Sequence, residues 1–451
     1  MTKNLTTGSV TKTLVFFSLP LLLSTLLQQF YNIADSMIVG QLIGEHGLAA
    51  VGAAYPITLF FVSVGTGTSM GTSVVLSRLF GANRREKFND AAYTALISFA
   101  ALGAALSVIG ILLSGPVMAL LNAQEIIFAD AKAYLAVYAA GAFATLIYNA
   151  ASGVFIGFGD SKTPLLLLFV SSVTNVILDY VIVRFFSGGV VGAAWATTVS
   201  QIFAAVLAAI LLIRRLRAMS GSRLQAKFDR VILKEITVAS VPCILQQGSV
   251  ALTNAVIQSL VNTFDTAVIA GFEVAQKLNT FFYMCMTTLG NAYSTFTSQC
   301  LGAEKYKRIK DGFIVTELIC LGCAAVIILI FQLLPNQLIG LFIDSNVSPA
   351  VVEVGVQFLR IISPLYIIIS YIISTGGLLR GTDRSMAFFI ETILEFAVRI
   401  AMCFILTKAW NSYTGMMWAW YFGSSCGFIM CLALSLHTFR TRVGRWERQK
   451  I

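Results

Sequence analysis

The sequence predicts an all-α membrane protein of twelve transmembrane helices, arranged as two six-helix bundles related by a pseudo-two-fold axis along the membrane normal. Three observations support this fold class: the composition, the long apolar runs and an internal repeat. Of the 451 residues, 57% are hydrophobic and 12% are charged, whereas a soluble globular protein carries about 25% charged residues. This composition excludes a soluble enzyme, a disordered tail protein and a nucleic-acid-binding domain.

The apolar runs have the length of membrane-spanning helices, which need about 20 residues. Membrane barrels show short alternating segments instead, so these runs favour a helical bundle. The first run, from Leu14, has no small-residue cleavage site, and it therefore predicts a retained helix rather than a signal peptide. The expected spans are 14–38, 50–78, 91–115, 131–157, 164–186, 190–213, 235–262, 268–299, 312–334, 355–379, 387–408 and 414–438.

The distribution of positive charge predicts the orientation. With the N-terminus inside, most of the 31 Lys and Arg residues fall in inside segments, and the outside segments hold Lys132, Arg184 and Lys408. Cytoplasmic loops are enriched in Lys and Arg, so both termini are predicted to lie in the cytoplasm, with the chain in a bacterial inner membrane. The net charge of +10 reflects these loops, and no nucleic-acid partner is expected.

The chain repeats itself at an offset close to 222 residues. Ser18-Leu19-Pro20 recurs as Ser240-Val241-Pro242, SRLFGA at 77–82 recurs as SQCLGA at 298–303, and Asp160 recurs as Asp383. The repeat unit contains six spans, an even number, so the halves are expected to be parallel repeats with the transport pathway between them. The predicted parts are an N-terminal lobe 1–213, a basic cytoplasmic linker 214–234, a C-terminal lobe 235–439 and a basic cytoplasmic tail 440–451.

Four polar residues stand out inside the first-half spans. Asp35 lies late in the first span, Asn175 and Asp179 share one face of the fifth, and Thr197 lies early in the sixth. A carboxylate at this depth is costly unless it is paired, hydrated or protonated. The positions along the helices predict one layer, whose oxygens suit Na⁺ or a proton shared by two carboxylates. The alternative is that these side chains only tie helices together.

The second half does not copy this set. At the positions that match Asp35, Asn175 and Asp179, the second half has Ile257, Val398 and Met402, respectively. Apolar side chains cannot coordinate a cation, so the cation site is predicted in the first half alone.

Other ionisable groups occupy the second half. Glu391, Glu395 and Arg399 lie at i, i+4 and i+8, and Glu273 and Lys277 form a further i, i+4 pair. Each set can neutralise itself. An internal salt bridge lining a wet cavity and a role in substrate binding both remain open.

The glycine-rich stretch GTGTSMG at 65–71 lies inside the second span. It is expected to loosen that helix, through close packing or local unwinding. It is not a phosphate loop, because it lacks the Gly-Lys-Ser/Thr ending.

Several motifs together resemble the multidrug and toxic compound extrusion (MATE) family. They are SLPLLLSTLLQQFYNIADSMIVG, SRLFGANRREK, FGDSKTP, NVILD and GAAWATT, and the resemblance covers essentially the whole chain. It implies two six-helix bundles arranged in a V, and the exchange of Na⁺ or H⁺ for organic, often cationic compounds. No cofactor beyond the coupling ion and no catalytic residue is expected.

The resemblance also implies residue roles. The family's N-lobe cation site maps onto Asp35, Asn175, Asp179 and Thr197, and the proline whose bending is linked to coupling maps onto Pro20. Another branch has an acid on the seventh helix, which SVPCILQQGSVALTN lacks. Candidate residues of the substrate cavity are Gln28, Tyr31, Asn32, Tyr55, Tyr148, Glu273, Glu391, Glu395 and Arg399.

The predicted function is a monomeric secondary antiporter that exports drugs or toxic compounds by alternating access. A flippase for lipid-linked precursors from the same superfamily is the alternative. Such proteins more often line their cavity with many bases, whereas here the spans contain Lys277, Arg360 and Arg399. An intramembrane enzyme is disfavoured, because no HExxH or GxSxG motif lies at membrane depth.

Overall fold

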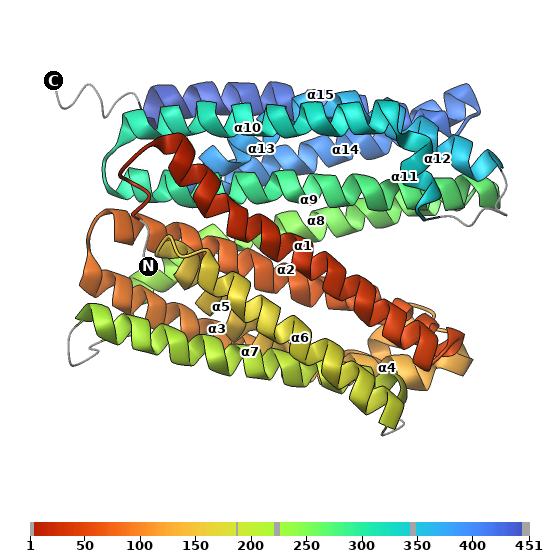
Figure 1. The fold of residues 1–451 in the computed structure, drawn as a ribbon, viewed down its shortest axis with the longest axis horizontal. Helices are drawn as coiled ribbons and strands as arrows, with labels where there is room; N and C mark the ends of the chain where they lie inside the picture. Colours follow the sequence, from red (N-terminus) through yellow and green to blue (C-terminus); the bar gives the residue numbers. More distant parts are fainter. Residues whose placement is uncertain (1–3, 186–187, 221–225, 343–348, 444–451) are drawn as a thin grey trace. The chain divides into compact units, whose positions relative to one another are not determined.

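The computed structural model describes residues 4–185, 188–220, 226–342 and 349–443, which form helices joined by short turns with no strand among them. Figure 1 shows their arrangement. The helices are α1 (Val10–Leu42), α2 (Glu45–Gly81), α3 (Arg85–Leu120), α4 (Glu125–Ala140), α5 (Ala142–Gly157), α6 (Lys162–Phe185), α7 (Gly189–Ser220), α8 (Arg230–Val261), α9 (Thr266–Gly302), α10 (Tyr306–Leu333), α11 (Pro335–Gly340), α12 (Pro349–Ile362), the 3₁₀ turn η1 (Ser363–Leu365), α13 (Tyr366–Gly381), α14 (Ser385–Trp410), α15 (Thr414–Thr438) and the π-helical turn η2 (Phe439–Val443).

The all-α membrane fold is confirmed. Within the described residues, nine helical segments are long and apolar enough to cross a membrane, and the bent pair α4–α5 makes a tenth. Helices α9 and α14 fall outside this set, although they coincide with the predicted spans 268–299 and 387–408. Both carry charged residues within the predicted span, such as Glu273 in α9 and Glu391 in α14. The number twelve therefore stays a prediction.

Within the described residues, one predicted span is bent at a break, and a second is interrupted by a 3₁₀ turn without a comparable bend. The segment 131–157 divides at Gly141 into α4 and α5, which differ in direction by 42°. The segment 355–379 divides at η1, where Pro364 lacks the backbone N–H that a continuous helix needs. Gly141 and Ser363, the first residue of η1, lie one repeat offset of 222 apart, so the break belongs to the repeated unit.

Side chains from neighbouring helices satisfy the carbonyls near each break. Thr198 of α7 donates its hydroxyl to the Val137 carbonyl at 3.1 Å. Gln332 of α10 donates its amide to the Arg360 carbonyl at 2.9 Å. Irregular backbone is tolerated at membrane depth when protein groups satisfy it in this way.

The chain forms two compact units, which we call the first and second unit. The first contains Met1–Leu5 and Leu19–Gly248, and the second contains Thr6–Ser18 and Ser249–Ile451. The division crosses α1 directly before Leu19 and Pro20. The predicted linker 214–234 is largely helical, because α7 continues to Ser220 and α8 begins at Arg230. Its residues 221–225, and residues 444–451 of the predicted tail, lie outside the described residues.

Close helix packing explains the glycines of α2, which is a continuous helix. A Cβ added to Gly71 would lie 2.5 Å from the backbone nitrogen of Ser240, and one added to Gly67 would lie 2.6 Å from that of Ile244. The stretch 65–71 thus lets α2 approach α8, and the alternative of local unwinding is wrong for this structure.

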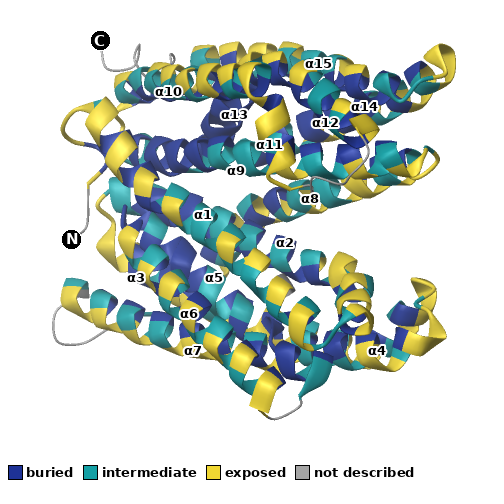
Figure 2. Ribbon diagram, turned by 45° about the vertical axis from the view of Figure 1, so that its right-hand side comes forward, coloured by how far each residue is buried: buried dark blue, intermediate teal, exposed yellow. Residues whose placement is uncertain are grey.

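In the second unit the most buried helix is α13, where all but three residues are buried, as Figure 2 shows. Two basic side chains, Lys305 of the α9–α10 turn and Arg308 of the first turn of α10, also bind backbone carbonyls of the segment that precedes α1. Lys305 donates to the Thr6 carbonyl at 2.7 Å, and Arg308 donates to the Thr7 and Gly8 carbonyls at 2.9 and 2.7 Å. The first turn of α1 is therefore fixed to the second unit.

Candidate functional site

The four predicted cation-site residues belong to the first unit, and the structure brings them together. Asn175 and Asp179 of α6 are 1% and 0% exposed. Asn175 donates its side-chain amide to the Thr197 hydroxyl of α7 at 3.3 Å. The Asp35 carboxyl of α1 lies close enough to that of Asp179 for their charges to interact. Three helices thus contribute to one polar cluster, which we call the acid cluster.

The acid cluster contains acceptors that no described group satisfies. Both carboxyl oxygens of Asp179 and the amide oxygen of Asn175 are buried without a hydrogen-bond partner in the described part of the chain. An ionised buried carboxylate without a compensating charge costs several kcal/mol. Simple tying of helices would leave the acceptors paired, so these open oxygens favour a cluster that binds a cation or a proton.

An apolar cluster closes the site one helical turn away. Val39, Val183 and Ala193 are 2%, 7% and 2% exposed and pack together. Val39 follows Asp35 by four residues and Val183 follows Asp179 by four, whereas Ala193 precedes Thr197 by four. In the predicted orientation, α7 runs antiparallel to α1 and α6. This register therefore places the acid cluster in one layer, as the sequence predicted, and the apolar cluster in the next layer.

Tyrosines surround the two acids, and the sequence analysis missed two of them. Tyr31 of α1, Tyr134 and Tyr138 of α4 lie within electrostatic range of the acid cluster. The rings of Tyr134 and Tyr138 stack with centroids 6.2 Å apart. Their i, i+4 spacing in AYLAVYAA is the signal that was available, but it does not by itself distinguish a site from ordinary packing.

The remaining first-unit cavity candidates are less closely tied to the acid cluster. Asn32 is exposed and donates to the Gln29 side chain at 3.4 Å. Tyr55 is 57% exposed, and Gln28 is half-buried. Tyr148 packs against the main apolar core of the unit. Pro20 is buried inside α1, next to the division between the units.

The second unit carries a separate row of charges on α14. Arg399 forms an ion pair with Glu395, and its guanidinium stacks on Trp420 at 4.1 Å from the ring centroid. Glu391 is 0% exposed, and one of its oxygens has no hydrogen-bond partner among the described residues. The predicted self-neutralisation therefore holds for the ion pair, whereas no ion pair involving Glu391 forms within the described residues.

Two glycines of α15 make room for this row. A Cβ added to Gly427 would lie 2.6 Å from a Glu391 carboxyl oxygen, and one added to Gly423 would lie 2.8 Å from the Arg399 Cβ. The absence of side chains at these positions lets α15 pack directly on the charged face of α14.

The Gly423→Ala substitution should therefore destabilise the protein. Its methyl group would press on the Arg399 Cβ and on the Glu395 carbonyl, which lies 3.0 Å away, and overpacking costs about 1–3 kcal/mol. We expect a melting temperature several degrees lower in detergent. Gly322→Ala in α10 is the matched control, because its Cβ meets nothing within 4 Å. An equal effect of both substitutions would contradict the packing argument.

The predicted pair Glu273–Lys277 is not formed. Glu273 is half-buried and Lys277 is exposed, and no ion pair within 4.0 Å joins them in the described chain. Water surrounds an exposed lysine and offsets most of what the pair would gain.

Glu317 is an acid that the sequence analysis missed. It lies in α10, where the Ser370 hydroxyl of α13 donates to it at 2.8 Å. Its isolation in the apolar run IVTELICLG was the available signal. The second unit therefore carries four acids within predicted spans on three helices, namely Glu273, Glu317, Glu391 and Glu395.

Comparisons with known proteins agree with this architecture. A family model described as MatE matches residues 20–181 and again residues 242–405. The two matches begin 222 residues apart, the offset found in the sequence, so the internal repeat is confirmed. Among curated proteins, the chain is 26% identical over 446 residues to the probable multidrug resistance protein YpnP of Bacillus subtilis, covering 99% of this chain and 98% of that protein. It is 27% identical to the probable multidrug resistance protein YoeA of the same organism, covering 75% and 74%.

A solved structure shares the fold. An outward-facing conformation of a multidrug resistance MATE family transporter of the MOP superfamily matches with a TM-score of 0.88 at 22% identity, covering 98% of each chain. This likeness supports the arrangement of helices within the chain.

Proposed function

Because this chain belongs to the MatE family, we propose that it is a secondary active antiporter that exports organic, often cationic compounds in exchange for Na⁺ or H⁺ by alternating access. The observation that carries the proposal is the acid cluster, in which buried, unsatisfied oxygens of Asp179 and Asn175 lie beside Asp35. The names of curated relatives, which describe multidrug resistance proteins, support an exported organic substrate.

The chemistry of the acid cluster suits a hard cation or a proton. Two carboxyls, an amide oxygen and a hydroxyl provide an all-oxygen set, such as Na⁺ prefers. Two neighbouring carboxyls can instead share one proton, since like charges at short range disfavour full ionisation. In either case the arriving positive charge offsets the cost of holding the buried Asp179 carboxyl beside the half-buried carboxyl of Asp35.

Helix α1 offers a route from ion binding to a change of state. Asp35 and Pro20 lie on this one helix, whose first residues belong to the second unit while the remainder belongs to the first. Proline interrupts the hydrogen-bond ladder of a helix and permits bending. We propose that charge neutralisation at Asp35 changes the packing of α1 around Pro20 and lowers the affinity for the exported compound. Coupling requires that ion and compound favour different states or compete for the same carboxyls.

The setting of the protein is part of the proposal. We propose a monomer in a cell membrane with both termini in the cytoplasm, which the distribution of Lys and Arg supports. Functionally, 1–213 and 235–439 would act as the two lobes, joined through the basic segment 214–234 and followed by the basic tail 440–451.

Reconstituted proteoliposomes test this function. Export of an organic cation such as ethidium is measured with a Na⁺ gradient or a pH gradient imposed separately, and we expect at least one gradient to drive it. Export that ignores both gradients would contradict antiport. A parallel assay of fluorescent lipid translocation addresses the flippase alternative, which lipid movement without organic-cation export would favour.

A further inference from the structure

A hollow in the first unit lies outside the acid cluster. It has a volume of about 590 Å³ and is bounded by the turn between α2 and α3 and by the last turns of α7. Its lining includes Phe80, Arg84, Arg85, Phe88, Arg215 and Met219. In the predicted orientation these helix ends face the cytoplasm.

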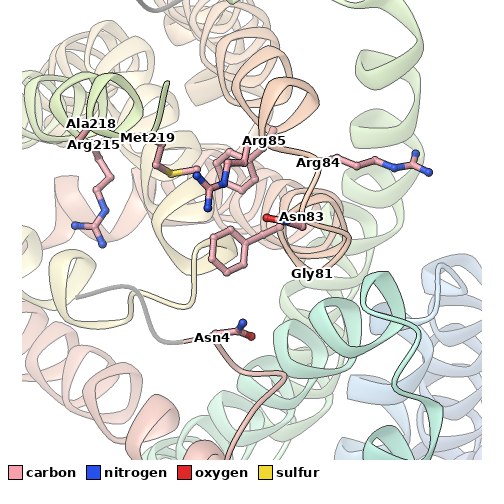
Figure 3. Close-up of a pocket in the computed structure, with 10 residues that line it drawn as sticks. Asn4, Gly81, Asn83, Arg84, Arg85, Arg215, Ala218 and Met219 are labelled. Carbon is pink, nitrogen blue, oxygen red and sulfur yellow. The ribbon is translucent and has the colours of Figure 1, made fainter. Parts of the chain in front are cut away.

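The rim of the hollow is positively charged. Figure 3 shows the side chains of Arg85 and Arg215 directed over the hollow from α3 and α7, whereas that of Arg84 extends away from it. Neither Arg85 nor Arg215 forms an ion pair with a carboxylate of the described residues. By contrast, Arg78 nearby in sequence is paired with Glu235 at 2.6 Å. As far as the described residues go, two guanidiniums thus remain available to an external anion.

The N-terminus of α3 adds to the positive charge at the rim of the hollow. Helix α3 starts at Arg85, and no side chain caps its N-terminus. The free N–H groups of a first helical turn carry partial positive charge and attract anions. Asn83, whose φ of 54° is in the left-handed region, lies in the turn that leads into this helix end, and both Asn83 and Arg85 line the hollow.

The floor of the hollow is apolar. Phe80 and Phe88 lie edge to face with centroids 6.0 Å apart, and Phe88 is fully buried. Met219 of α7 also belongs to this apolar floor. A free inorganic anion gains nothing from such a surface, whereas the glycerol and first methylene groups of a lipid can cover it.

We propose that this hollow binds the phosphate group of an anionic phospholipid of the cytoplasmic leaflet, with Arg85 and Arg215 as the phosphate ligands. Basic pockets between helices on the cytoplasmic side are suited to lipid headgroups, and guanidiniums recognise phosphate oxygens in a bidentate manner. The positive-inside rule accounts for arginines near this surface, but it requires neither a hollow nor two unpaired guanidiniums directed over it. A free phosphate presents the same oxygens, and the experiment separates the two sources.

The test uses the full-length purified protein in a non-ionic detergent. Native mass spectrometry measures the retention of short-chain phosphatidylglycerol, of phosphatidylcholine with the same chains, and of inorganic phosphate. For Arg85→Gln combined with Arg215→Gln, we expect phosphatidylglycerol affinity at least about tenfold lower, because each charge-assisted contact contributes strongly. Ala218→Glu, which places a carboxylate at the exposed edge of the hollow, should weaken binding while keeping both arginines. The Ala218→Glu variant therefore tests the site even where the double variant folds poorly.

Two single substitutions are the matched controls. Arg214→Gln and Arg217→Gln each remove a charge from the same part of α7 as Arg215, but both residues are exposed and neither lines the hollow. Both variants should bind phosphatidylglycerol like the wild type. Equal binding by all variants, or an equal loss in the controls, would overturn the proposal. Phosphate that binds alone and displaces the lipid would overturn the lipid as ligand and assign the site to a free anion. Because the readout is lipid retention, failure here leaves the antiport proposal untouched.

Discussion

Ion-driven export is expected to be lost in the Asp35→Asn variant, by about a hundredfold or more, while the protein inserts and folds like the wild type. Asparagine keeps the shape of the side chain but carries no charge and cannot take up a proton. A hydrogen bond to a charged group contributes up to about 3 kcal/mol, and an energy of this size corresponds to the expected hundredfold loss of export. The measurement is export of an organic cation from proteoliposomes under an imposed Na⁺ or H⁺ gradient.

A matched control removes a carboxylate elsewhere in the same unit. Asp130 lies on α4, near the tyrosines of the acid cluster in sequence, but its side chain is exposed. Asp130→Asn should therefore export at the wild-type rate. Gradient-driven export at the wild-type rate in Asp35→Asn would remove Asp35 from the coupling site.

The sequence was informative about the acid cluster because polarity is rare at membrane depth. Asp35, Asn175 and Asp179 are conspicuous in apolar helices, and the helical rise fixes their depth. Their distance to one another depends on how three helices pack, and the structure supplied that through the adjoining apolar cluster around Val183.

The tyrosines near the acid cluster and the break at Gly141 depend on tertiary packing, which the sequence alone did not predict. Tyr134 and Tyr138 look like any aromatic pair until α4 is placed beside the acids. Gly141 lies in a run that is apolar enough to form one uninterrupted helix. The break there is stabilised by Thr198 of another helix, whose hydroxyl donates a hydrogen bond to a carbonyl near the break. Pro364 was a visible local signal, because proline lacks the N–H that an interior helical position donates. It was not decisive, since α1, α2, α3 and α8 continue through Pro20, Pro56, Pro116 and Pro242.

The charged row of α14 also shows which contacts a sequence can predict and which it cannot. Its i, i+4 spacing predicted the Glu395–Arg399 pair correctly, because that contact is local. That Glu391 has no ion-pair partner among the described residues could not be read from the spacing. Gly427 of α15 approaches one carboxyl oxygen without a side chain, and the Thr392 hydroxyl donates to the other at 3.4 Å.

The two units should respond differently to loss of an acid. The repeat places Ile257 at the position of Asp35, and this side chain is 4% exposed in an apolar setting. No cation site equivalent to the acid cluster can form there. We therefore expect Asp179→Asn to remove the response of export to the ion gradient, and Glu395→Gln to preserve it.

The cost of Glu395→Gln is expected elsewhere. Arg399 is 7% exposed and pairs with Glu395, so the substitution leaves a buried guanidinium without its charge partner. Breaking a buried pair in this way costs about 3–5 kcal/mol, part of which the stacking on Trp420 can offset. The variant should show a lower melting temperature or weaker binding of the exported compound, together with export that still rises with the imposed gradient. Measuring export against a series of Na⁺ and H⁺ gradients in both variants separates these effects. If Glu395→Gln exports at a rate independent of the gradient while Asp179→Asn still responds to it, the coupling site lies in the second unit, and the buried Glu391, which no ion pair neutralises within the described residues, becomes its first candidate.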